Sequence, residues 1–168
     1  MSKAGDLVVT RWAARYRGWT FPCAIGRGGI GHKRGEGDNI TPVGSFEIAA
    51  ALYRADRMAR PAFGVPVFAI GPADIWSDDP NDPDYNHGLT ARNYRFSHEN
   101  LARPDPLYDV FAVLNFNWPE AQAGAGSAIF LHHWRKPRHP TAGCVAFAPT
   151  VLHYILRTWQ PGARLIIR

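Results

Sequence analysis

Short apolar runs, separated by glycines, prolines and charged residues, dominate the chain and predict a strand-rich fold. The expected strands cover residues 7–12, 19–25, 44–52, 65–70, 108–117, 128–133, 144–147 and 163–167. Only the segment 150–159 has convincing helical periodicity, because its apolar positions fall on one face: Val151, Leu152, Ile155, Leu156 and Trp159. We therefore expect a mainly β fold with few short helices, forming a single domain over residues 1–168.

Two long segments interrupt this pattern. Residues 26–44 contain seven glycines, and this composition predicts a loop. The loop only superficially resembles a phosphate cradle, since no G-K-[ST] occurs and no helical pattern follows it. Residues 71–106 are rich in proline and acidic residues, and we expect them to be irregular, with one short helical turn at 97–101. Connections of this length are usually functional, so this one is a candidate cap over a substrate cleft.

Composition supports the strand-rich prediction and limits the partners. The chain has 6 Trp, 6 Tyr, 9 Phe, 16 Gly and 14 Pro, a mixture that suits strands with many turns. Its formal charge of +5 can attract an acidic polymer, but the cations are dispersed and no nucleic-acid-binding motif occurs. We therefore expect no nucleic-acid partner. We also expect no integral membrane segment, because no apolar run approaches the ~20 residues needed to span a bilayer.

The most informative stretch is Ser127–Phe147. An apolar run ends at His132 and His133, and Cys144 follows in the sequence Thr141-Ala142-Gly143-Cys144. A histidine on one strand beside a cysteine on the next can form a thiol nucleophile with its base, and a close imidazole is expected to lower the pKa of the thiol. Gly143 allows close backbone approach, so the N–H groups of Gly143 and Cys144 are candidates to stabilise an oxyanion.

Other interpretations of these residues remain open. His132 and His133 alternate on a strand, so only one of them can face Cys144. A zinc set of His132, His133, His139 and Cys144 fits no known spacing, and the acidic segment 76–86 lacks the offsets of a calcium loop. We therefore expect neither a metal nor a cofactor. Cys23 lies among apolar residues and is expected to pack in the core, with both thiols free.

Several motifs together resemble the YkuD-type L,D-transpeptidases, which cross-link peptidoglycan. The resemblance includes [ST]-x-Gly-Cys at 141–144 and T-P-x-G at 41–44. It is closest to a small single-domain branch of that family. The motifs of that branch occur as A-I-G-R-G-G-I at 24–30, W-S-D-D-P-N-D-P-D-Y-N at 76–86, G-S-A-I-F-L-H at 126–132 and P-T-A-G-C-V-A at 140–146.

The resemblance implies a β-sandwich-like catalytic domain and assigns roles to five residues. Cys144 would be the nucleophile and His132 the base that activates it, held by the backbone carbonyl of His133. Gly143 would donate its N–H to the oxyanion, and Thr141 would occupy the Ser/Thr position of the family motif. The commoner motif has histidine where this chain has Ala142, and often asparagine or arginine at the position of Ala146. Relatives in this branch are linked to 1,3 cross-links, between L-alanine and diaminopimelate.

The expected reaction is acyl transfer between two peptidoglycan stem peptides through a thioester on the cysteine. Hydrolysis by the same site, as an L,D-carboxypeptidase or amidase, and a non-catalytic wall-binding module are the alternatives. The resemblance implies action in the periplasm or cell envelope, although the N-terminus lacks the apolar core of a signal peptide. The residues expected to line the substrate cleft are Lys33, Arg27, Trp76, Tyr85, Asn86 and Asn117.

Overall fold

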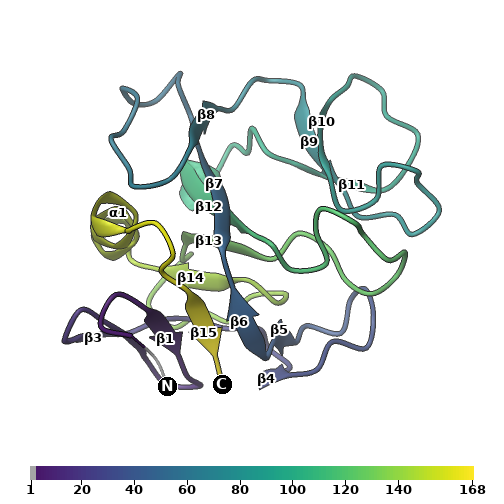
Figure 1. Ribbon diagram of the computed structural model, residues 1–168. Coiled ribbons are helices and arrows are strands. Elements are labelled where there is room, and N and C mark those ends of the chain that lie inside the picture. Colours follow the sequence, from purple (N-terminus) through teal and green to yellow (C-terminus); the bar gives the residue numbers. More distant parts are fainter. Residues whose placement is uncertain (1–2) are drawn as a thin grey trace.

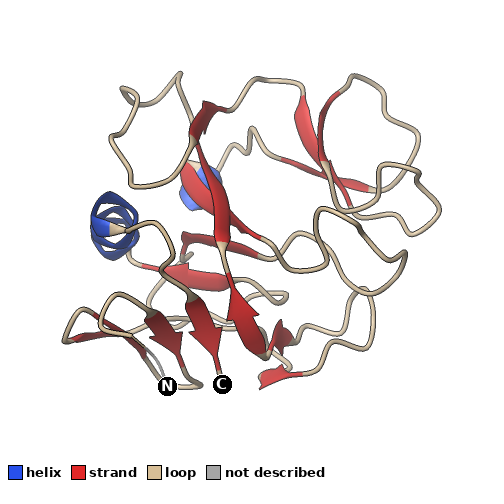
Figure 2. Ribbon diagram, in the orientation of Figure 1, coloured by secondary structure: helices blue, strands red, loops and turns tan. Residues whose placement is uncertain are grey.

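The computed structural model describes residues 3–168 and is built mainly of β-strands arranged in two five-stranded sheets (Figures 1 and 2). The first sheet has the order β3 (Trp19–Phe21), β2 (Ala14–Tyr16), β1 (Leu7–Val9), β15 (Leu165–Ile167) and β6 (Gly44–Phe46). The second has the order β14 (Val145–Phe147), β13 (Phe130–His133), β12 (Val110–Leu114), β7 (Ile48–Tyr53) and β8 (Val67–Ala69). The expected mainly β fold is confirmed.

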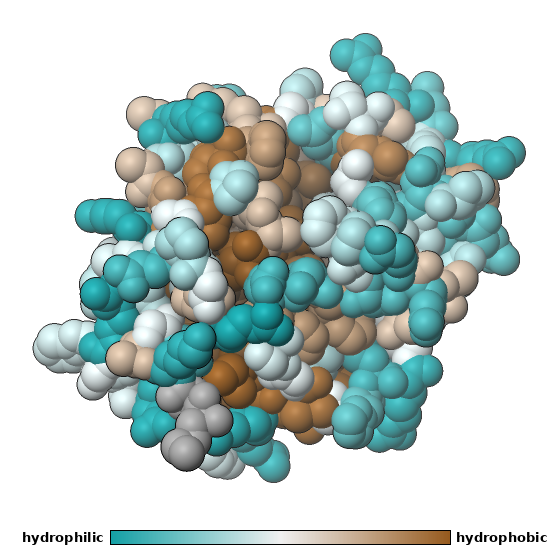
Figure 3. Space-filling view, viewed as in Figure 1, coloured by the Kyte–Doolittle hydropathy of each residue, from teal (hydrophilic) through white to brown (hydrophobic). Residues whose placement is uncertain are grey.

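One hydrophobic core joins the two sheets to the single α-helix, α1 (Pro149–Thr158). Strands from both sheets and one face of α1 bury their apolar side chains in it, among them Leu7, Leu165, Leu131, Val145 and Leu152. Pro149 stands in the first turn of α1, where its missing N–H costs no hydrogen bond. On the face shown in Figure 3, a broken band of apolar residues also reaches the surface between hydrophilic ones.

The opposite face of the second sheet is covered by an inserted unit. A three-stranded sheet of β10 (Gly88–Thr90), β9 (Asp74–Ser77) and β11 (His98–Asn100) lies at the upper right of Figure 1, followed by the short 3-10 helix η1 (Pro106–Tyr108). A second cluster of buried residues, which includes Trp76, Tyr108, Phe111 and Phe130, joins this unit to the second sheet. A two-stranded sheet of β4 (Ile30–Gly31) and β5 (Thr41–Pro42) closes the glycine-rich segment.

The structure corrects several expectations. The segment 71–106 is ordered as a sheet, and the helical turn expected at 97–101 is wrong, because β11 pairs there with β9. Its acidic residues explain the order, since Asp82 is buried and accepts hydrogen bonds from the hydroxyls of Ser77 and Tyr94. The turn between β2 and β3 is tight, because β2 continues to Tyr16 and Arg17 and Gly18 both adopt positive φ.

Candidate active site

Strand pairing brings the cysteine and the first histidine of the Ser127–Phe147 stretch to one side of the second sheet. β13 and β14 run parallel, with Leu131 opposite Val145 and His132 opposite Ala146, and Cys144 directly precedes β14. The Phe130 N–H lies 3.4 Å from the Cys144 sulfur, and the Cys144 thiol donates to the Ala128 carbonyl at 3.2 Å. Cys144 and His132 border the same cavity, of about 310 Å³.

His132 is held in one tautomer. Its Nδ1 lies 2.7 Å from the carbonyl of His133, which can only accept, so Nδ1 carries the proton and Nε2 is left as a base. The ring of Tyr108 packs edge-on against the ring of His132, with centroids 5.5 Å apart. His133 points to the other face of the sheet, where its ring stacks on His153 of α1. The two histidines therefore diverge, as strand geometry requires.

The Cys144 thiol and the His132 imidazole are both neutral in this structure. Burial lowers the pKa of His132 to about 4. Burial, reinforced by the charge of Glu99, raises the pKa of Cys144 to about 12. The prediction of a lowered thiol pKa is therefore wrong, because a neutral imidazole offers no positive charge and the sulfur is buried away from water. Cys144 remains 9% exposed at the cavity wall and forms no disulfide with Cys23, which packs in the core as expected.

The turn before Cys144 is fixed by two threonine hydroxyls. The Thr141 hydroxyl donates to the Cys144 carbonyl at 2.6 Å and accepts from the Gly143 N–H at 3.1 Å. The Thr41 hydroxyl is buried, donates to the Gly143 carbonyl at 2.8 Å and accepts from the Gly26 N–H at 2.7 Å. Gly143 has a φ of 144°, and an added Cβ would lie 3.0 Å from the Ile40 carbonyl oxygen. A side chain therefore fits poorly at this position.

The six residues expected to line the cleft separate into two groups. Arg27 borders the cavity that contains Cys144, whereas the other five do not. Trp76, Asn86 and Asn117 form a buried hydrogen-bond network: the Trp76 indole donates to the Asn86 side chain, which donates in turn to the Asn117 carbonyl. These side chains hold the insertion against the second sheet.

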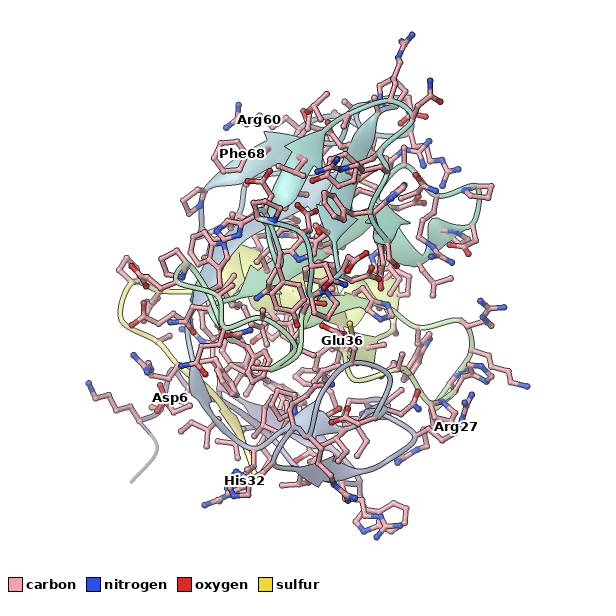
Figure 4. All side chains as sticks on the ribbon, turned by 90° about the vertical axis from the view of Figure 1, so that its right-hand side faces the viewer. Asp6, Arg27, His32, Glu36, Arg60 and Phe68 are labelled. Atoms are coloured by element: carbon pink, nitrogen blue, oxygen red, sulfur yellow. The ribbon has the colours of Figure 1, made fainter. Side chains whose placement is uncertain are left out.

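Lys33 stabilises the glycine-rich segment 26–44 from within, whereas Tyr85 connects that segment to the rest of the molecule. Lys33 forms a buried ion pair with Asp38 at 2.6 Å. Burial alone would raise the pKa of Asp38, but hydrogen bonds from Lys33 and two backbone N–H groups lower it to about 2. The Tyr85 hydroxyl donates to Glu36, which lies near the middle of the molecule in Figure 4, and accepts from the Gly126 N–H at 2.9 Å.

Sequence reasoning missed the part of the cavity wall that the insertion supplies. Glu99 of β11 borders the cavity together with Arg103 and Tyr108. The Tyr108 hydroxyl donates to Glu99 at 2.5 Å, and the Arg103 guanidinium lies 5.1 Å from the centre of the Tyr108 ring. Burial raises the pKa of Glu99. No motif singled out these residues: Glu99 lies on β11, which the sequence did not predict as a strand, and Arg103 and Tyr108 follow β11 in the chain.

The fold and this site define a β-rich domain with a cysteine–histidine pair in a lined cavity, an arrangement suited to nucleophilic acyl chemistry. The chain belongs to the YkuD family, the L,D-transpeptidase catalytic domain, whose family model matches residues 7–167. Members of this family are cysteine-dependent L,D-transpeptidases that act on cell-wall peptidoglycan. Neither the curated proteins nor the solved structures gave a match. Within residues 3–168, no helix is both long and apolar enough to cross a membrane.

Proposed function

We propose that this protein is a peptidoglycan L,D-transpeptidase that joins two stem peptides through a thioester on Cys144. The observation that carries the proposal is the shared cavity of Cys144 and His132, with the imidazole held in the tautomer that leaves Nε2 free. The proposed chemistry needs a base beside a thiol. Membership of the family indicates peptidoglycan as the substrate class. The site of action would be the periplasm or cell envelope, where such substrates lie.

The first half-reaction acylates the cysteine. As the sulfur attacks the carbonyl carbon of the donor stem, the thiol proton moves to Nε2 of His132, and the carbonyl oxygen becomes an oxyanion facing the Cys144 N–H. His132 then gives the proton to the departing nitrogen, the C–N bond breaks and a thioester remains. The Gly143 N–H, which Thr141 engages at rest, is available as a second donor if that hydroxyl turns away.

The second half-reaction forms the cross-link. A neutral amine of the acceptor stem attacks the thioester, its proton passes to His132, the new C–N bond forms and the C–S bond breaks. The thiol recovers its proton from His132. Because a protonated imidazole is disfavoured by burial, His132 carries the proton only transiently, which suits a group that must take and return it in each half-reaction.

We propose the 1,3 cross-link for this protein. Ala142 and Ala146, which replace larger polar residues of the commoner family motif, both border the cavity beside Cys144. Small side chains at these positions leave more room on the donor side than the usual residues do. Tandem mass spectrometry of cross-linked dimers distinguishes the possibilities, because an L-alanine–diaminopimelate bond and a diaminopimelate–diaminopimelate bond give different fragments.

The test of the main proposal is to incubate the protein and its Cys144→Ala variant with defined muropeptides and to identify products by mass spectrometry. Transfer predicts dimers, and a gain in intact protein mass equal to the acyl group. Shortened monomers without dimers would instead indicate the hydrolytic L,D-carboxypeptidase or amidase. Full activity of the Cys144→Ala variant, or binding of sacculi with no product at all, would refute the catalytic role and favour a wall-binding module.

A further inference from the structure

A second cavity, larger than the catalytic one, opens beside it. Its volume is about 870 Å³, within the range of small-molecule and peptide sites. Arg27 and Pro140 border both cavities, so the two are adjacent. We call this cavity the arginine groove, after the charged residues in its wall: Arg11, Arg27, Arg138 and Arg168. The family motif at 24–30 runs along it, and the proposed chemistry gives that stretch no role.

The charge in the arginine groove is uncompensated. No aspartate or glutamate occurs among the described residues that border it, whereas Glu99 borders the catalytic cavity. None of the five ion pairs within residues 3–168 involves an arginine of the groove. Arginines gathered around a cavity without an acid repel one another, and an anionic ligand relieves that repulsion.

The rest of the wall suits an extended ligand. Gly29 and Gly31 border the groove, and a Cβ on Gly29 would meet nothing within 4 Å, so a ligand chain can approach this backbone closely. Trp12, which is 68% exposed, offers a flat apolar face at one end, and the Arg11 guanidinium lies 5.1 Å from the centre of its ring. Arg138 donates to the Trp12 carbonyl at 2.7 Å and so fixes this end of the groove. In Figure 4, Arg27 and His32 lie on the lower part of the molecule, below Glu36.

We infer that the arginine groove binds the carboxylates of the acceptor stem peptide while the amine of that peptide reaches the thioester on Cys144. This inference rests on the proposed function. The catalytic cavity, about 310 Å³, is at the small end of ligand sites, so the donor fills it and the second stem needs an adjoining surface. Stem peptides carry several carboxylates, and guanidinium groups bind carboxylates with paired, charge-assisted hydrogen bonds.

The test separates acceptor binding from acylation. Arg11→Gln and Arg138→Gln each remove one charge from the groove, and Arg157→Gln removes one from the exposed end of α1 as a matched control. We expect the double groove variant to raise the KM for the acceptor about tenfold to hundredfold, with the rate of thioester formation from donor alone unchanged. Its products should shift from dimers towards hydrolysed monomers, while the Arg157 variant behaves like the parent protein.

A binding measurement gives an independent readout. Titration calorimetry of the Cys144→Ala protein with an acceptor tripeptide should show binding that the groove substitutions weaken by the same factor, and that amidation of the peptide carboxylates also weakens. Equal weakening by Arg157→Gln, or no difference between the free and amidated peptides, would overturn the inference. If the unsubstituted protein forms no thioester with the donor, the proposed function itself is refuted. The two failures are therefore distinguishable.

Discussion

Thr41 links the glycine-rich segment to the turn that precedes Cys144, the proposed nucleophile, and replacing Thr41 with valine tests that link. Thr41 is fully buried, and its hydroxyl is the partner of both the Gly26 N–H and the Gly143 carbonyl. Valine keeps the shape of the side chain and deprives both backbone groups of their partner. Each buried group left unpaired costs about 1–3 kcal/mol, and the added methyl returns about 1 kcal/mol, so we expect a loss of about 1–5 kcal/mol in the free energy of unfolding.

Thr41→Ser is the matched control, because it keeps the hydroxyl and removes only a methyl group, at a cost of about 1 kcal/mol. Urea denaturation of both variants measures the difference. For a domain of this size, the valine variant should also melt roughly 2–20 °C below the parent protein. Since Gly143 directly precedes the nucleophile, muropeptide turnover should fall about tenfold or more in the valine variant at a temperature where it stays folded.

The result that would refute this reasoning is a valine variant no less stable than the serine variant. That outcome would mean that the hydroxyl contributes no net hydrogen bonding and that Thr41 serves only to fill space. A valine variant that is destabilised but turns over normally would separate the two roles. It would show that Gly143 is held in place by its contact with the Ile40 backbone rather than by the threonine.

Two further predictions follow from the buried ionisable groups. The rate of Cys144 alkylation by iodoacetamide should keep rising beyond pH 10, as expected for a thiol with a pKa of about 12. The Glu99→Gln variant should react faster at the same pH, because it lacks a nearby negative charge. A rate that reaches a plateau near pH 9 would contradict this prediction. The pKa of His132 is about 4 in the folded protein and about 6.5 when unfolded, so its contribution to stability is complete above pH 6.5 and is lost as the pH falls towards 4. The free energy of unfolding should therefore drop by about 3 kcal/mol over that range, and by less in His132→Gln.

The sequence predicted the elements whose signal is local. The apolar runs that became β7, β8, β12, β13 and α1 were located within a few residues, because strands in the core leave short apolar runs and a helix buried on one side leaves an apolar stripe. The small strands β9, β10 and β11 were not foreseen. Each has three or four residues, and they depend on one another and on buried acids such as Asp82 for their order. Such mutual support leaves no pattern in any single segment.

The residues of the candidate site also divide into those that the sequence predicted and those that it did not. The sequence predicted that Cys144 and His132 lie close together, because two neighbouring strands and a short loop carry them, and the two residues do border one cavity. Glu99 and Arg103 were not, since they reach the cavity from an insertion some thirty to forty-five positions earlier in the chain. Trp76 and Asn86 belong to a shared motif, but their side chains bond to each other and to the backbone rather than border the catalytic cavity. A motif therefore does not distinguish a residue that contacts substrate from one that holds the wall.

The neutral state of the thiol and the imidazole bears on how the site works. A preformed thiolate would be reactive towards any electrophile, whereas a buried thiol becomes a nucleophile only when a bound carbonyl draws its proton to His132. The insertion contributes directly to this state, because Glu99 on β11 raises the pKa of Cys144 in addition to the effect of burial. An approaching ammonium group of a stem peptide would offset that charge, and with it part of the cost of ionising the sulfur. On this reasoning the inserted sheet couples the reactivity of the cysteine to occupation of the cavity, which favours a bound substrate over small electrophiles from solution.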